Sequence, residues 1–251
     1  MTTQTEVAKE GGHWYDASGA PRYTIMGLNG QDRPTTLRDA RQNGWLPSVT
    51  TILKVAAAPG LEKWKRDQIL LSALTLPRVE GETLESFGKR IQEDSEAQGK
   101  AARDLGTAIH GSLERAFQGL LYPAEHKAIV EAVFAVVEPY KGTGWQAERS
   151  FAGNGYGGKI DLYSNLAVID YKTKAFGPEA KVEKLAWPEM EIQLSSYDKG
   201  LELHPRKRIN VFVSTTNPGL VKLHEWPDND MAWEKFKCLL KYWQLSKGYA
   251  P

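Results

Sequence analysis

Apolar and polar positions repeat with two different periods along this chain. Before about residue 140 the apolar residues recur every three or four positions, which predicts helices, and after it much of the chain alternates with period two, which predicts strands. A short helix is expected to begin after an N-cap at Ser48 and to end near residues 59–60. The other expected helices cover residues 61–76, 82–104, 108–117, 124–140, 190–203 and 228–245, the last with Asp228 as its N-cap. The expected strands cover residues 145–151, 156–163, 166–171, 210–214 and 220–226. Aromatic residues flanking a Ser-Gly pair and a proline further predict a hairpin or short extended segments within 13–29.

This order of elements predicts an α/β (α+β) fold, with a central mixed β-sheet flanked by helices behind a helical N-terminal half. The length of 251 residues fits one domain. Residues 1–12 are polar and end in glycine, which predicts a flexible tail. Residues 13–251 are then expected to form a single domain, with a helical elaboration at about 45–140 and the core sheet at about 144–226.

Composition narrows the class of protein. With 41% hydrophobic and 25% charged residues the chain is typical of a globular protein, and a net charge of +1 leaves any nucleic-acid contact to a local patch. No apolar run approaches the ~20 residues of a membrane span, and the N-terminus lacks the pattern of a signal peptide, so we expect an intracellular protein with no membrane partner. The single cysteine, Cys238, excludes an internal disulfide and a four-cysteine zinc or iron–sulfur site.

Candidate chemistry is concentrated in residues 155–174, which read as two short strands joined by a turn. The second strand starts apolar and then carries Asp170 and Lys172, which are two apart and therefore project from the same face. If the strands pair as a hairpin, Asp161 comes close to Asp170. Two buried carboxylates need charge compensation, and hard oxygen ligands of this kind suit Mg²⁺ or Mn²⁺. The alternative is a simple ion pair at a strand end, Asp170 with Lys172 or Asp161 with Lys159.

Four motifs in order resemble those of a known family. They are Gly106-Thr107-Ala108-Ile109-His110, Gly158-Lys159-Ile160-Asp161, Asp170-Tyr171-Lys172-Thr173 and Gln193-x-x-x-Tyr197. Together they resemble the PD-(D/E)XK nuclease superfamily in its RecB-like exonuclease branch, and residues 47–53 are similar to phage-type exonucleases and to the mitochondrial genome-maintenance exonuclease. The resemblance covers roughly residues 45–200. Ile160 stands where the family's motif has proline, although many members also lack that proline, and the iron–sulfur cluster of several relatives cannot form with one cysteine.

The resemblance implies a restriction-endonuclease-like core and a DNA exonuclease that depends on Mg²⁺ or Mn²⁺ and acts on ends or single strands. It implies metal ligation by His110, Asp161, Asp170 and the backbone carbonyl of Tyr171. Lys172 is expected to orient or deprotonate the attacking water or to stabilise negative charge. It also places Gln193 and Tyr197 at the edge of the active site. A recombination or single-strand-binding protein is a further partner that such nucleases could have.

Several of these residues also have structural interpretations. His110 shares its helix face with Leu113 and Phe117, so it could be a hydrogen-bonded core histidine. Glu148 could be a further metal ligand, a carboxylate behind a ligand, or an exposed charge on its strand. Tyr197 could simply pack in the core.

DNA contacts are less visible in the sequence. Lys63, Lys65 and Arg66 around Trp64 are candidate phosphate contacts, as are residues 206–208, and the resemblance adds the residues after the catalytic lysine, Thr173 and Lys174. Trp64 or Trp187 could stack on an unpaired base. The alternative for each basic cluster is solvated surface.

Three other functions stay open. A structure-specific endonuclease would use the same chemistry, and a non-catalytic DNA-binding module on a nuclease fold would not require the two aspartates and the lysine. A small-phosphate hydrolase would need a Gly-rich phosphate cradle, which we do not find. For an exonuclease, we expect the helical N-terminal half to arch over the site, so that the end of a DNA strand must be threaded into the site.

Overall fold

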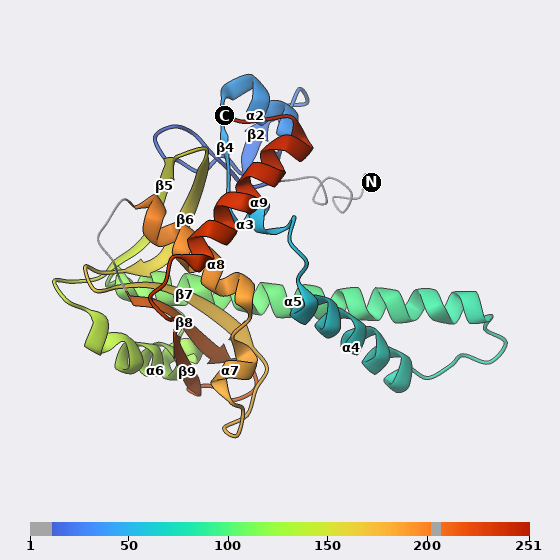
Figure 1. The fold of residues 1–251 in the computed structure, drawn as a ribbon. Coiled ribbons are helices and arrows are strands. Elements are labelled where there is room, and N and C mark those ends of the chain that lie inside the picture. Colours follow the sequence, from blue (N-terminus) through green and yellow to red (C-terminus); the bar gives the residue numbers. More distant parts are fainter. Residues whose placement is uncertain (1–11, 202–206) are drawn as a thin grey trace.

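A five-stranded mixed sheet forms the centre of the computed structural model, which describes residues 12–201 and 207–251. Its strand order is β5-β6-β7-β8-β9, with a parallel pairing between β7 and β8 and antiparallel pairings elsewhere. The strands are β5 Gln146–Gly153, β6 Tyr156–Tyr163, β7 Ala167–Lys174, β8 Lys207–Ser214 and β9 Val221–Glu225. The predicted mixed sheet flanked by helices is therefore confirmed (Figure 1). Residues 1–11 of the expected tail, and Arg206 of the basic run, lie outside the described residues.

Helices cover both faces of this sheet and bury a separate apolar core on each. On one face, α5 (Leu84–Phe117) and α6 (Lys127–Val137) pack against the apolar side chains of β7 and β8. On the other, α3 (Val49–Leu53), α8 (Pro188–Gly200) and α9 (Met231–Lys247) enclose a second core. Short 3₁₀ turns flank α6 at Ala124–His126 and Glu138–Tyr140, and α7 (Val182–Leu185) precedes α8. The sheet is thus held rigidly between two layers, independently of any ligand.

Helix α5 differs from the sequence prediction of two helices at 82–104 and 108–117. It is continuous over 34 residues and passes through Gly106 without a break. A Cβ atom at Gly106 would lie 2.8 Å from Oγ1 of Thr173 on β7, so glycine allows the helix to approach this strand closely. The tertiary contact, rather than a helix end, explains the glycine.

The N-terminal half of α5 and helix α4 (Pro59–Thr75) form a helical hairpin, which we call the arm. The arm projects away from the sheet (Figure 1). The expectation that this helical part of the chain arches over the site is therefore wrong.

The segment before the arm is only partly helical. Strands β1 (Trp14–Tyr15) and β4 (Leu46–Pro47) pair with each other, as do β2 (Thr24–Met26) and β3 (Asp32–Pro34), and α2 spans Leu37–Asn43. Ser48 caps α3 as predicted, because its Oγ accepts a hydrogen bond from the Thr51 N–H at 3.0 Å. In contrast, the N-cap position of α9 is held by Asp230, whose side chain makes no capping hydrogen bond, and not by Asp228, the residue that the pattern favoured. None of the helices in the described ranges is long and apolar enough to cross a membrane.

Candidate active site

The site lies where β6 and β7 separate. These strands pair only at Leu162 with Ile169 and at Tyr163 with Val168, although both strands continue well beyond these pairs. The side chain of Asp161 enters the gap, and its Oδ2 accepts the Tyr171 N–H at 2.9 Å. The separation therefore opens a polar space between two strands that are otherwise apolar and buried.

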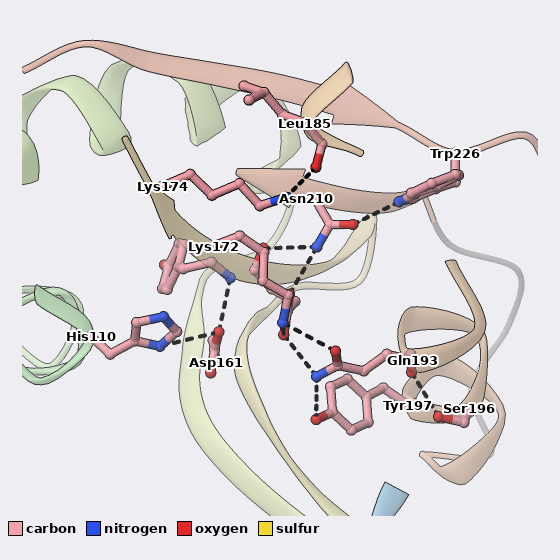
Figure 2. Close-up of polar contacts among 12 residues, drawn as sticks. His110, Asp161, Lys172, Lys174, Leu185, Gln193, Ser196, Tyr197, Asn210 and Trp226 are labelled. Atoms are coloured by element: carbon pink, nitrogen blue, oxygen red, sulfur yellow. Dashed lines mark hydrogen bonds and ion pairs between the residues drawn. The ribbon is translucent and has the colours of Figure 1, made fainter. Parts of the chain in front are cut away.

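Asp170 and Lys172 project from the same face of β7 on the far side of this gap, as the alternation predicted. Lys172 Nζ lies 3.0 Å from Oδ1 and 2.8 Å from Oδ2 of Asp170. It also donates to Oε1 of Gln193 at 3.1 Å, while Gln193 Nε2 donates to Asp170 Oδ1 at 3.0 Å (Figure 2). The lysine ammonium is therefore held by two groups at once, which reduces its rotational freedom.

Helix α8 supplies the wall behind this lysine. Gln193 and Tyr197 are one turn apart, and Gln193 Nε2 donates to the Tyr197 hydroxyl at 2.8 Å. The Tyr197 ring also packs edge-on against Phe151 in the core, with the ring centroids 6.2 Å apart. Tyr197 thus combines the two interpretations left open by the sequence, because it is a core residue that also orients Gln193.

Two residues that the sequence did not single out complete the cluster. Asn210 lies directly beside Asp170 in the parallel β7–β8 register, and its Nδ2 donates to Asp170 Oδ2 at 2.8 Å. Trp226 in turn donates from Nε1 to Asn210 Oδ1 at 2.7 Å, which fixes the amide orientation. No local pattern marks either residue, since Asn210 meets Asp170 through strand pairing across 40 residues and Trp226 contacts Asn210 rather than Asp170.

His110 approaches the site from α5. Its Nδ1 lies 3.5 Å from Oδ2 of Asp161, and its ring contacts Tyr171 edge-on at a centroid distance of 5.8 Å. Burial acts to lower the pKa of His110, but the charge and hydrogen bond of Asp161 together with the charge of Asp170 outweigh it, so this pKa is raised. The histidine is thus neither a plain core residue nor fully exposed, but faces a carboxylate.

The two aspartates respond to their surroundings in opposite directions. Burial acts to raise the pKa of Asp161, but His110 and Lys172 outweigh this effect and the pKa is lowered. Burial raises the pKa of Asp170, and the charge of Asp161 adds to the rise against the opposing effect of Lys172. The surroundings therefore stabilise the charged form of the partly buried Asp161, whereas the buried Asp170 carries its charge at a cost in electrostatic free energy. Perturbed pKa values of this kind are typical of functional sites.

Glu148 lies on β5 opposite Asp161, between the paired residues Ala147–Leu162 and Arg149–Ile160. Its φ of 58° is in the left-handed region, which is unfavourable for a residue other than glycine and is found most often at functional sites. Its carboxylate forms an ion pair with Lys159 of β6. Burial raises the pKa of Glu148, Lys159 opposes this, and the charge of Asp161 adds to it. Glu148 is therefore a buried, paired carboxylate beside the site rather than an exposed strand charge.

The donor chemistry of this cluster fits a hard divalent cation. An imidazole and two carboxylates face the same gap, and a cation would offset the repulsion that keeps the pKa of Asp170 raised. As the side chains stand, no three His, Cys, Asp or Glu residues within 12–201 and 207–251 are close enough together to hold an ion. Both oxygens of Asp170 instead accept hydrogen bonds from nitrogen donors, so metal binding would require this carboxylate to exchange partners.

The expected DNA-binding residues fall into two groups. Lys63 and Lys65 lie on the exposed surface of the arm, where ion pairs with Asp67 at 2.5 Å and Glu62 at 2.8 Å neutralise them locally. Trp64 and Arg66 lie on the same exposed helix. The two lysines are therefore paired within the helix, and Trp64 and Arg66 remain candidate DNA contacts.

Thr173 and Lys174, by contrast, lie close to the site on β7. Lys174 Nζ donates to the Leu185 carbonyl at 2.7 Å and lies 3.3 Å from the centre of the Trp187 ring. Burial lowers the pKa of Lys174 to about 8. A Cβ atom at Gly60 would lie 2.7 Å from atoms of the same Trp187 ring, so this partly exposed ring packs closely against the start of α4 as well as against Lys174.

Comparison with known proteins leaves the family open. No family model and no curated protein matches the chain. Among solved structures, an alkaline exonuclease from Laribacter hongkongensis is similar over 47% of this chain and 63% of its own, with 11% sequence identity and a TM-score of 0.36. SSO0001 is similar over 74% of this chain and 87% of its own, with 15% identity and a TM-score of 0.33. The chain thus spans less than two thirds of the exonuclease, and at such TM-scores the functional interpretation depends on the site itself.

Proposed function

We propose that this protein is a divalent-metal-dependent deoxyribonuclease of the PD-(D/E)XK type that hydrolyses phosphodiester bonds at DNA ends or in single strands. The observation that carries the proposal is the convergence of Asp161, Asp170 and Lys172 where β6 and β7 separate, with Gln193 hydrogen-bonded to both Asp170 and Lys172. A strand-end ion pair alone would not require a buried second carboxylate facing a histidine. The motifs noted in the sequence agree with this assignment.

In the proposed reaction, water attacks phosphorus, the bond from phosphorus to the leaving oxygen breaks, and that oxygen takes up a proton as the water gives one up. A Mg²⁺ or Mn²⁺ ion held by His110, Asp161, Asp170 and the Tyr171 carbonyl would supply Lewis acidity and lower the pKa of a bound water. The Lys172 ammonium, fixed in place by Asp170 and Gln193, stabilises the negative charge that develops on the phosphate oxygens.

Supporting residues keep this arrangement ready. Asn210 and Trp226 orient Asp170, and the Tyr197 hydroxyl orients Gln193. Such prior orientation lowers the reorganisation needed during the reaction, which is the main source of electrostatic catalysis.

End-labelled linear DNA and closed circular DNA of the same sequence test the activity. With Mg²⁺ or Mn²⁺, we expect mononucleotides or short products from linear duplex or single strands, and no cutting of the closed circle. Defined cuts in the circle would indicate the endonuclease alternative. Binding without any cleavage of either substrate would indicate the non-catalytic alternative.

The ligand role of His110 gives a separate prediction. His110→Ala should weaken metal affinity by on the order of 10-fold or more, as the loss of a ligand or its support usually does. Isothermal titration of the variant with Mn²⁺ measures this, and His126→Ala is a control histidine that is hydrogen-bonded to Ser112 within the chain. A lowered melting temperature with unchanged Mn²⁺ affinity would mean that His110 is only structural.

A further inference from the structure

We propose that His13, Tyr23, Lys54 and Lys159 form a nucleotide-binding site beside the candidate active site, which takes an unpaired base against its rings and a phosphate between its lysines. This inference rests on the proposed function and specifies its substrate as a single-stranded or frayed segment of DNA.

The N-terminal segment that carries this site is attached directly to β6. The His13 N–H donates to Thr51 Oγ1 at 3.1 Å, and the His13 carbonyl accepts the Ser48 N–H at 2.8 Å. Ser48 in turn forms a β-bridge with Gly157. A Cβ atom at Gly157 would lie 2.8 Å from the Tyr15 ring, so this glycine lets the segment pack onto the strand four residues before Asp161. The position of His13 is therefore fixed relative to the catalytic strand.

Two aromatic rings stand together on this segment. The His13 and Tyr23 rings have centroids 4.5 Å apart and an angle of 33° between their planes. The Tyr23 hydroxyl is 2.7 Å from the hydroxyl of Tyr15, which is buried and holds the pair in place. His13 is exposed and Tyr23 partly exposed. A preordered pair of rings with an open side suits base stacking, because every nucleobase has a flat π-face.

Two ammonium groups lie around the same imidazole. Lys54 follows α3 directly, and Thr51 of that helix accepts the His13 N–H. Lys159 lies on β6 two residues after Gly157, which bridges to Ser48. Partial burial lowers the pKa of His13, and the charges of these two lysines act in the same direction. Lys54 is exposed, and within the described residues it has no acidic partner. Lys159 is partly neutralised by Glu148. The net charge around the neutral His13 ring is thus positive. This arrangement suits a nucleotide, which offers a negative phosphate and a flat base.

The site adjoins the catalytic cluster on two sides. Lys159 precedes Asp161 by two residues on β6, and its partner Glu148 lies opposite Asp161 on β5. Gly157, Lys159 and Asp161 alternate along β6 and share one face of that strand, so the Tyr15 ring over Gly157 lies on the same face as Asp161. A nucleotide bound here would present an adjacent phosphodiester to Lys172. A base can stack on the rings only when it is unpaired, which is why we infer a single-stranded or frayed substrate.

Binding in EDTA tests this site apart from catalysis. The probe is a short fluorescent oligothymidine, measured by anisotropy, and the variants are Tyr23→Ala and Lys54→Gln. We expect Tyr23→Ala to weaken binding roughly 10-fold through loss of one stacked base. Lys54→Gln should lower the slope of log affinity against log salt by roughly 0.7, the value for one phosphate on a single strand. Tyr23→Phe keeps the ring but loses the hydrogen bond to Tyr15, so it should weaken binding less than Tyr23→Ala does. Lys127→Gln removes an exposed lysine on α6 across the sheet and should bind like the wild type.

A second measurement does not depend on the folding of any variant. In the wild-type protein, NMR titration of the His13 ring, assigned with His13→Gln, should show its pKa rising when the oligothymidine is added, because the bound phosphate offsets the two lysines. Oligothymidines with and without a 5′-phosphate distinguish a terminal from an internal phosphate as the group bound. Blunt duplex should give a smaller rise than single strand.

The site is rejected if the oligothymidine leaves the His13 pKa unchanged and Tyr23→Ala and Lys54→Gln both bind with wild-type affinity. If cleavage nevertheless persists in those variants, the proposed nuclease function survives the loss of this site. Conversely, stacking-dependent binding by a protein that cleaves nothing would retain the site and reject the nuclease function.

Discussion

Lys172→Ala is expected to abolish cleavage while DNA binding and metal binding survive. Lys172 shares the face of Asp170 and is held between that carboxylate and Gln193, at the gap between β6 and β7 rather than on an outer surface. A lysine fixed in this way contributes to the charge of the transition state more than to ground-state binding. Its loss should therefore reduce the rate of the chemical step by on the order of 10²-fold or more.

Single-turnover cleavage at saturating enzyme measures the chemical step, and filter binding in Ca²⁺ measures affinity for DNA. Lys127→Ala, on the opposite face of the sheet, is the control for the loss of one positive charge. A lysine that only anchors phosphate would weaken binding with a shallower salt dependence and leave the turnover of bound DNA intact. Wild-type single-turnover rates in Lys172→Ala would remove the catalytic role of this lysine and most of the support for a nuclease.

Removal of divalent metal is expected to stop hydrolysis completely without unfolding the protein. Asp161 and Asp170 sit on strands with an apolar core on each face of the sheet, so the fold does not depend on a metal as a zinc finger does. Without a cation, the carboxylates keep their contacts with His110, Lys172 and Asn210, which compensate part of their charge. The loss of hydrolysis should thus come from the missing cation and not from unfolding, and it should be reversible.

Circular dichroism and cleavage, measured in parallel on EDTA-treated protein, test this expectation. The spectrum should stay native, and activity should return with added Mg²⁺ or Mn²⁺. Full activity in excess chelator would contradict the metal assignment. Loss of the native spectrum would contradict the independence of the fold from the metal.

Much of the fold could be predicted from local periodicity. Alternation with period two places Asp170 and Lys172 on one face of β7, and spacing by four places Gln193 and Tyr197 on one face of α8, because these relations depend only on backbone geometry within one element. The cap at Ser48 is local in the same sense. The gap that receives Asp161 is different, since it depends on where the pairing of β6 and β7 stops.

The sequence by itself indicated the helices and strands and the approach of two carboxylates and a lysine along one hairpin, since residues near one another in the chain decide these features. Only the tertiary structure decided that Asn210 and Trp226 hold Asp170, and that α5 continues through Gly106 because it packs against Thr173. Contacts of this kind join residues far apart in sequence. Strand order, register and layer packing select them through the free energy of the whole core, which no local window of residues contains.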